Sequence, residues 1–153
     1  MPNTYSQMYV QVVIVVKFRK SLIHKSWKDE LYKYITGIVT NKGQKLLRIN
    51  GVENHVHILL NIKPNLALSD LVKDIKVNST NWINDRGFND AKFQWQEGFG
   101  AFTYSISQLD NVIKYIENQE EHHKKQSFKE EYILFLKNFE IEYKDEYLFD
   151  FLE

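Results

Sequence analysis

Two histidines separated by a single residue, His55 and His57, are the first feature of the sequence that points to chemistry. They lie in the apolar segment 54–60 (NHVHILL), which is typical of a β-strand. Residues i and i+2 of a strand face the same side, so the two imidazoles project together while Val56 faces the other way. Two neighbouring imidazoles make half of a metal site. An H-x-H pattern is weak evidence by itself, and two partly exposed histidines on a solvated sheet face are the alternative.

The second candidate is the pair Tyr115 and Gln119, four residues apart in a segment with helical periodicity. The apolar stripe of this helix falls within 109–116. Residues i and i+4 are neighbours on a helix surface, so the phenol and the amide lie side by side at the edge of the stripe, and His122 continues their line. On their own, these residues are more typical of a boundary aromatic residue and a solvated amide.

Together with their surroundings, these residues resemble the motifs of the single-tyrosine HUH transposases, the small enzymes of single-strand-moving bacterial insertion sequences. The segment 54–60 (NHVHILL) resembles the histidine motif of that family. The segment 112–119 (VIKYIENQ), preceded by 98–102 (GFGAF), resembles its catalytic helix, with tyrosine and glutamine four apart. The segment 12–19 (VVIVVKFR) resembles its first strand. Each motif is weak alone, but three in register over nearly the whole chain are specific.

The resemblance implies a DNA transposase that cleaves and rejoins single-stranded DNA at hairpin-bearing insertion-sequence ends. Tyr115 would be the nucleophile, forming a 5′-phosphotyrosine link and releasing a 3′-hydroxyl. His55, His57 and Gln119 would hold one divalent cation over the scissile phosphate. A cation there stabilises the charge of the transition state, which helps because a phenol with a pKa of about 10 is a poor nucleophile at neutral pH.

The cation implied by the resemblance is Mg2+ or Mn2+. Amide oxygens, waters and phosphate suit magnesium and manganese, whereas imidazole ligands suit zinc and related ions. His122 and His123, which follow the tyrosine helix, leave a zinc site open as an alternative. Asn54 stands where many relatives have an aspartate.

The partners implied by the resemblance are single-stranded DNA with hairpin ends and a second copy of the chain in a homodimer. In such a dimer the tyrosine of one subunit can complete the site of the other. Basic side chains after the first strand and on the long central helix are candidate phosphate-binding groups. These residues are Lys17, Arg19, Lys20, Lys73 and Lys76. A solvated basic surface is the alternative for any one of them.

Two other classes of function remain open. The chain is alternatively a domesticated, non-mobilising protein that binds structured single-stranded nucleic acid, or a metal-dependent hydrolase that activates water. The full set of Tyr115, His55, His57 and Gln119 argues against a pure binding protein, which has no need of it. A hydrolase would differ from a transposase by leaving no protein attached to the DNA.

The elements that position these residues follow from the hydrophobic pattern. The β-branched segment 8–17 predicts a central buried strand, and the apolar spacing over 27–39 predicts a helix. The segments 45–49 and 55–62 predict two strands joined by a turn at 50–51 (NG).

The rest of the core repeats this order. A helix follows Pro64 and ends at 84–87, and an aromatic strand over 93–104 is interrupted by glycines. The order βαββαβ predicts an α+β fold of the ferredoxin-like type, an antiparallel sheet with helices on one face, plus a carboxy-terminal helix.

Two capping-box pairs open the last helices. Ser107 with Asp110 opens the tyrosine helix, which is expected to run to about His123. Ser127 with Glu130 opens the carboxy-terminal helix.

Length and composition limit the class of protein. The 153 residues predict one domain over 1–153, with an acidic carboxy-terminal extension from about 140. An apolar content of 43% argues against disorder, and the lack of cysteine excludes disulfides and thiolate metal sites. Without an apolar run of about 18 residues, we expect a soluble cytoplasmic protein.

The zero net charge hides an uneven distribution. Residues 1–86 carry 13 Lys and Arg against 6 Asp and Glu, whereas residues 87–153 carry 7 against 14. Such asymmetry is typical either of a nucleic-acid face on the basic half or of two halves that neutralise each other within the fold.

Overall fold

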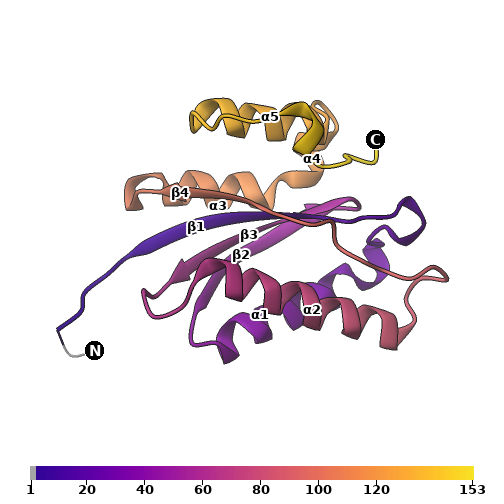
Figure 1. Cartoon of the computed structure of the whole chain (residues 1–153), viewed down its shortest axis with the longest axis horizontal. Helices are drawn as coiled ribbons and strands as arrows, with labels where there is room; N and C mark the ends of the chain where they lie inside the picture. The colour runs from indigo at the N-terminus through magenta and orange to yellow at the C-terminus, as the bar shows by residue number, and fades with distance from the viewer. Residues whose placement is uncertain (1–2) are drawn as a thin grey trace.

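The sheet is built around β1 (Met8–Val15), a strand with buried side chains on both faces. β1 pairs antiparallel with β3 (His55–Ile62) and with β4 (Gly100–Tyr104), and β2 (Lys45–Val52) pairs antiparallel with β3. The computed structural model describes residues 3–153, and its strand order is β2-β3-β1-β4 (Figure 1). The α+β fold with the ferredoxin-like order of elements is therefore confirmed.

α1 (Lys25–Asn41) and α2 (Leu68–Arg86) cover one face of this sheet (Figure 1). Their buried residues form one apolar cluster with alternate strand residues, among them Val12, Ile14 and Ile58. Full burial of such a side chain contributes about 1.5 to 3 kcal/mol, so this layer stabilises much of the fold. In the described part of the chain, no helix, α2 included, is both long and apolar enough to cross a membrane.

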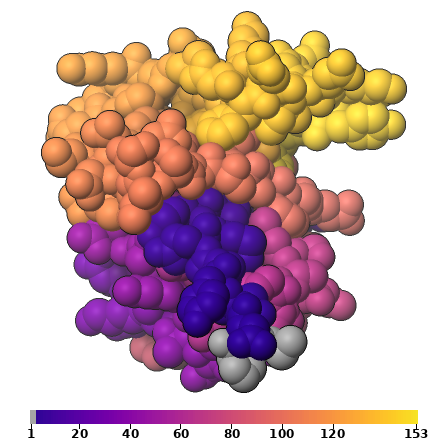
Figure 2. Space-filling view, turned by 90° about the vertical axis from the view of Figure 1, so that its left-hand side faces the viewer, coloured from indigo at the N-terminus to yellow at the C-terminus, as the bar shows by residue number. Residues whose placement is uncertain are grey.

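α3 (Leu109–Glu117), α4 (Gln119–His123) and α5 (Phe128–Asn138) lie against the opposite face. α3 shares an apolar cluster with Leu59 of β3, and α5 shares another with Val13 of β1. In the space-filling view the orange and yellow carboxy-terminal part of the chain lies above the indigo part, and the violet and magenta residues lie below it (Figure 2). The carboxy-terminal helices thus add a second layer to the sheet.

The turn between β2 and β3 lies at 53–54, so the turn predicted at 50–51 is wrong. Gly51 is instead a residue of β2, where it pairs with Val56. A Cβ atom at Gly51 would collide with the backbone carbonyl oxygen of His55. The glycine therefore serves the close approach of two strands rather than a turn.

The helix predicted over 107–123 is divided in two. Its start is also different, because the capping box uses Ser105 and Gln108 and opens a short 3-10 turn ahead of α3. At Asn118 the backbone leaves the helical region (φ −98°, ψ 22°), and α4 begins at the next residue. The capping box of Ser127 and Glu130 opens α5 as predicted.

Only part of the predicted strand 93–104 is continuous. β4 supplies its second half, while Trp95 makes an isolated bridge with Val16 and the chain bends at Gly98, whose φ is +79°. Short 3-10 turns complete the structure: η1 (Arg19–Ser21), η2 (Ile106–Gln108) and η3 (Asp145–Tyr147).

The last residues of the chain pack against the start of α5. The Phe151 ring meets the Phe128 ring at a centroid distance of 5.2 Å. The Glu153 carboxylate accepts a hydrogen bond from the backbone N–H of Phe128 at 2.8 Å. Asn54, at the β2–β3 turn, donates its amide N–H to the Phe151 carbonyl oxygen at 2.9 Å. The acidic extension is thereby joined to the strand that carries the two histidines.

Candidate active site

His55 and His57 project from β3 toward the layer of α3, α4 and α5. Both side chains are fully buried, and their ring centroids lie 5.0 Å apart. His55 stacks on Phe128 of α5 at a centroid distance of 3.7 Å, and His57 lies edge-on to Tyr115 of α3 at 6.0 Å. The two histidines therefore occupy the closed interface between sheet and helices, not a solvated sheet face.

In each of these histidines the Nδ1 atom forms a hydrogen bond with a neighbouring amide side chain. Asn54 Oδ1 lies 2.7 Å from Nδ1 of His55, and Gln11 Nε2 lies 2.7 Å from Nδ1 of His57. The Tyr104 hydroxyl in turn donates to Gln11 Oε1 at 2.7 Å. Such supporting hydrogen bonds orient histidines that bind metals. Both Nε2 atoms are thereby directed into the site.

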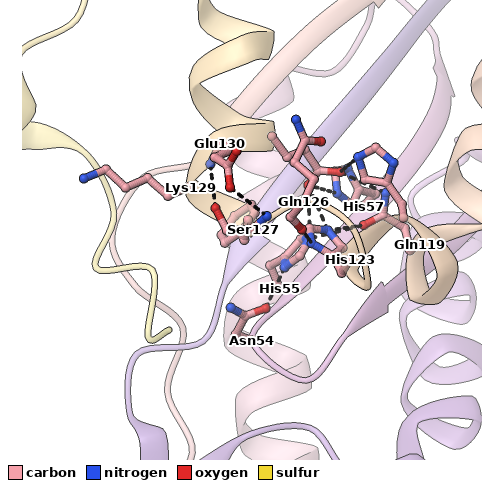
Figure 3. A network of polar contacts seen from close by, with 12 residues as sticks. Asn54, His55, His57, Gln119, His123, Gln126, Ser127, Lys129 and Glu130 are labelled. Carbon is pink, nitrogen blue, oxygen red and sulfur yellow. Dashed lines mark hydrogen bonds and ion pairs between the residues drawn. The ribbon is translucent and has the colours of Figure 1, made fainter.

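Gln119 and His123 of α4 meet the strand histidines in the same space (Figure 3). Gln119 is fully buried, although it directly follows the exposed Asn118 at the helix break. Its Oε1 lies 3.2 Å from Nε2 of His55 and 3.1 Å from Nε2 of His123. The structure thus brings together the three residues expected to hold a cation, and it adds His123.

A buried carboxylate that sequence reasoning missed, Glu131 of α5, lies at the centre of these groups. Its Oε1 lies 3.3, 3.1 and 3.2 Å from the Nε2 atoms of His55, His57 and His123. Its Oε2 accepts a hydrogen bond from Gln119 Nε2 at 3.1 Å. Three imidazoles, one amide and one carboxylate therefore converge.

The sequence does contain a signal for Glu131. This residue lies on the stripe that α5 turns toward the sheet, with Phe128, Tyr132 and Leu136, all of which are buried. A carboxylate on the buried stripe of a helix is costly unless charged or polar partners surround it. Such a position is a candidate site residue even without a motif.

Tyr115 lies at the border between this cluster and an open cavity. Its half-buried side chain donates its hydroxyl hydrogen to Glu131 Oε2, and its ring meets His122 at a centroid distance of 4.9 Å. A cavity of about 310 Å³ opens beside it, with Gln11 and Tyr104 also in its wall. The expected nucleophile is thus accessible from the cavity and adjacent to the histidines.

Burial governs the protonation of the site. It lowers the pKa of His55 to about 4, so this imidazole is neutral at pH 7. Burial also raises the pKa of Tyr115 above its ordinary value, and the charge of Glu131 raises it further. Burial acts to raise the pKa of Glu131, but hydrogen bonds and positive charge from the facing imidazoles of His123, His55 and His57 outweigh it and lower this pKa. The site therefore combines a carboxylate that favours a positive charge beside it with a protonated phenol that needs activation.

These groups fit a divalent metal ion. One ligand atom each from His55, His57, His123 and Glu131 lies within 4.8 Å of all the others. Ligands bound to one ion at about 2.0 to 2.2 Å are separated by about 3.0 to 3.5 Å. The contacts of 3.1 to 3.3 Å between Glu131 Oε1 and the three Nε2 atoms fall in that range. Neutral imidazole and ionised carboxylate are also the forms that bind metals.

A comparison with known protein families matches residues 4–119 to the family described as "Transposase IS200 like". The chain belongs to the IS200-like transposase family. The matched region includes both strand histidines, Tyr115 and Gln119, whereas His123 and Glu131 lie beyond it.

Solved structures share the fold of this IS200-like transposase. A protein from Deinococcus radiodurans R1 that was assigned as a transposase aligns with a TM-score of 0.59 and 22% identity, over 76% of this chain and 94% of that chain. A REP-associated tyrosine transposase bound to a REP hairpin aligns with a TM-score of 0.60 and 14% identity, over 79% of this chain and 72% of that chain. A comparison with curated protein sequences found no match.

The basic residues of the transposase fall on different parts of the fold. Lys17, Arg19 and Lys20 follow β1 at the end of the sheet where the histidines lie, because Val15 pairs with His55. All three are exposed, although Arg19 also donates to the Glu153 backbone oxygen at 3.1 Å.

The other two basic residues lie on α2, which covers the opposite face of the sheet. Lys73 is exposed there. The Lys76 amine is half-buried and donates to the backbone oxygens of Gln96, at 2.8 Å, and of Gly98. The five candidates therefore do not form one continuous patch around the site.

Proposed function

We propose that this chain is a single-strand DNA transposase that cleaves and rejoins DNA through a 5′-phosphotyrosine intermediate. One observation carries the proposal: in a member of the IS200-like family, the Tyr115 hydroxyl lies beside two inward-facing histidines and Gln119 at the edge of an open cavity. A buried binding surface alone would need neither the tyrosine nor the converging imidazoles.

In the first step the Tyr115 hydroxyl loses its proton and its oxygen forms a bond to the scissile phosphorus, while the bond from phosphorus to the 3′-oxygen breaks and the 3′-oxygen takes up a proton. The DNA 5′ end then remains on the tyrosine, and the other end leaves as a 3′-hydroxyl. A 3′-hydroxyl from another DNA end reverses these bonds in the second step. The phosphotyrosine preserves the ester, so rejoining needs no nucleotide cofactor.

His55, His57 and Gln119 are proposed to hold one divalent cation, Mg2+ or Mn2+. When bound, this ion supplies Lewis-acid stabilisation of the charge on the phosphate oxygens. The chain itself orients the nucleophile, because the Tyr115 hydroxyl donates to Glu131 and so has a defined direction. Asn54 and Gln11 keep the two strand imidazoles in place.

The proposed substrate is single-stranded DNA with hairpin ends. A structural relative was solved with a REP hairpin, and Lys17, Arg19 and Lys20 are exposed at the histidine end of the sheet. Phosphate contacts release counterions on binding, so replacing Lys20 with alanine should lower the slope of log K against log salt concentration for DNA binding by about one unit.

Lys73 and Lys76 would contact the DNA only if the DNA passes around to the α2 face. Equal slopes for Lys73→Ala and the wild type would place Lys73 outside the DNA path.

The proposed assembly is a homodimer. Within one chain β2 and β4 are edge strands, each paired on one side only, so the sheet offers edges to a second copy. Light scattering coupled to size exclusion distinguishes a species of twice 18.3 kDa from the single chain.

The test of the chemistry is a covalent adduct. The protein is incubated with labelled single-stranded hairpin DNA from the sequence flanking its gene, with Mg2+ or Mn2+, and resolved on a denaturing gel. We expect a metal-dependent protein–DNA band that Tyr115→Phe abolishes while DNA binding persists. Tyr147→Phe is the matched control, because Tyr147 is 79% exposed and outside the site. An adduct that survives Tyr115→Phe removes this residue from the nucleophile role.

Two other results would change the assignment of function. Binding without any adduct on the correct DNA end would indicate a non-mobilising binding protein. Cleavage without an adduct would indicate a hydrolase.

A further inference from the structure

We infer that Glu131 and His123 are ligands of the cation, and that the completed centre selects a divalent transition-metal ion such as Mn2+ or Zn2+ over Mg2+. The inference rests on the proposed cation at His55 and His57. It adds His123 from α4 and Glu131 from α5 as ligands. Both residues lie beyond the region 4–119 that matches the family.

One oxygen of Glu131 is the common neighbour of the three imidazoles. Oε1 lies between 3.1 and 3.3 Å from the Nε2 atoms of His55, His57 and His123. The second oxygen, Oε2, is already used, because it accepts from Gln119 and from Tyr115. The carboxylate thus offers one free oxygen to the histidines and uses the other to hold the nucleophile.

The hydrogen bonds at the Nδ1 atoms of the histidines determine where the imidazole hydrogens are. They show that most of the close contacts at the Nε2 atoms bring two hydrogen-bond acceptors together. Asn54 donates its N–H to the Phe151 carbonyl, so its Oδ1 faces His55 and must accept from Nδ1. His123 Nδ1 lies 3.0 Å from the backbone oxygen of Gln126, which can only accept. In a neutral imidazole the hydrogen is then on Nδ1, and the Nε2 of both residues carries a lone pair directed into the site.

Gln119 adds a further acceptor. Because its Nε2 donates to Glu131, its Oε1 is the atom that faces Nε2 of His55 and of His123, at 3.2 and 3.1 Å. An oxygen of an amide or an ionised carboxylate has no hydrogen to donate. Two oxygens and two nitrogen lone pairs therefore meet in a buried space, where the repulsion between them is weakly screened.

A positive charge among these atoms removes the conflict. A proton on one Nε2 would satisfy only the contacts of that nitrogen, whereas one metal ion satisfies all of the lone pairs at once. His57 differs from these two, because Gln11 Nε2 donates to its Nδ1 and the Tyr104 hydroxyl donates to Gln11 Oε1. Neutral His57 therefore carries its hydrogen on Nε2 and donates it to Glu131 Oε1, and it can bind the ion through Nε2 once the Gln11 amide turns over and accepts from Nδ1.

The ligand set decides which ion is preferred. Three imidazole nitrogens with a carboxylate suit manganese, zinc and related ions, whereas Mg2+ prefers oxygen ligands and retains its waters. A set of His55, His57 and Gln119 alone would leave room for several waters. Adding His123 and Glu131 replaces water with nitrogen and with a negative charge.

The test is direct metal binding to the chelator-treated, full-length protein without DNA. Mn2+ is titrated by the loss of its free EPR signal, and Mg2+ by competition with Mn2+. We expect Mn2+ to bind at least about 100-fold more tightly than Mg2+, and Glu131→Gln to weaken Mn2+ binding at least about tenfold. Glu121→Gln is the matched control, because the Glu121 side chain is exposed and pairs with Lys124 at 2.9 Å. Equal Mn2+ and Mg2+ affinities would overturn the selectivity.

The pattern of variants separates this inference from the proposed function. Unchanged Mn2+ affinity in Glu131→Gln, with loss in His55→Ala and His57→Ala, would overturn the present inference and leave the proposed three-residue set. Unchanged affinity in all three variants would overturn the proposed metal site itself.

A second measurement does not depend on the folding of Glu131→Gln. Zn2+ is added to wild-type protein with nitrogen-15-labelled histidine, and the imidazole resonances are followed by NMR. We expect the Nε2 signals of three histidines, His55, His57 and His123, to shift with one equivalent of Zn2+. His24, just before α1, is the internal control, because it lies outside this group of side chains. A shift of only two signals would remove His123 from the ligand set.

Discussion

The two faces of the sheet have been put to different uses, although the same strands supply both. On the α1–α2 face, β3 contributes Val56, Ile58 and Leu60 to a wholly apolar cluster. On the α3–α5 face, the alternate residues of β3 include His55 and His57, which are equally buried but polar. Burial of apolar side chains on the first face stabilises the fold. Burial of polar groups on the second face costs free energy but forms the site.

This contrast shows where a small α+β fold can carry chemistry. Among the described residues, the one carboxylate that is buried, Glu131, belongs to the α3–α5 layer. The buried Ser79 on the other side is satisfied locally, by the Ile75 carbonyl and by the Trp95 indole N–H. The α1–α2 layer, whose helices come first in the sequence, stabilises the sheet. The helices α3 to α5, which follow β4, complete the site on the other face.

The neighbours His57 and Ile58 offer the sharpest test, because they point to opposite faces. His57→Ala should lower DNA cleavage at least about 1000-fold, since it removes a proposed ligand of the ion that would stabilise the phosphate. Its far-ultraviolet circular dichroism should remain that of the wild type. Cleavage within a few-fold of the wild type would contradict the assignment of His57 to the site.

Ile58→Ala should have the opposite profile. Truncating this fully buried side chain should lower the free energy of unfolding by about 2 to 5 kcal/mol, because it leaves a cavity under α1 and α2. Urea unfolding measures the loss, and cleavage per folded molecule should stay near the wild-type rate. A large loss of cleavage with intact stability would show that the two faces are not separable.

The pH dependence of stability should be set by the α3–α5 face. His55 has a pKa of about 4 in the folded protein and 6.5 when unfolded, so between these values the unfolded state binds more protons. The metal-free protein should therefore lose about 2 kcal/mol from this residue between pH 7 and pH 5. The comparison of wild type with His55→Asn in urea at both pH values isolates this loss from the opposite contribution of His123, whose pKa is raised. Identical pH dependence in the two proteins would contradict it.

The smallest expected effect concerns the support of the histidines. Asn54→Ala removes the acceptor at His55 Nδ1 and should weaken metal binding about tenfold, without changing the ligands themselves. Asn61→Ala, a change near the far end of β3, is the matched control. Equal affinities in the two variants would show that packing against Phe128 alone orients the ring.

Much of this arrangement could be predicted from the sequence. The resemblance of the segments 54–60 and 112–119 to the motifs of the family pointed to the strand histidines, Tyr115 and Gln119. The order of elements follows from hydrophobic periodicity. Glu131 could not be placed by motif, because it reaches the site across 74 residues of sequence from His57. The helix break at Asn118 was also missed, because residues 117–127 (ENQEEHHKKQS) contain no apolar residue and no glycine or proline that would mark a helix end. Tertiary packing decides where this helix ends.

The turn at 53–54 was missed for a related reason. Asparagine followed by glycine is a strong hairpin signal, but the pairing of β2 with β3 places these residues in the ladder. Packing of the strands, rather than local preference, determined the register.

Gly51 gives the fold an unexpected genetic property. It neither binds nor reacts, yet any side chain there would push against the backbone of His55. A screen for inactive alleles would therefore return substitutions at Gly51 alongside those at the histidines. Read without the structure, such alleles would suggest a catalytic glycine, whereas their defect would be a displaced strand.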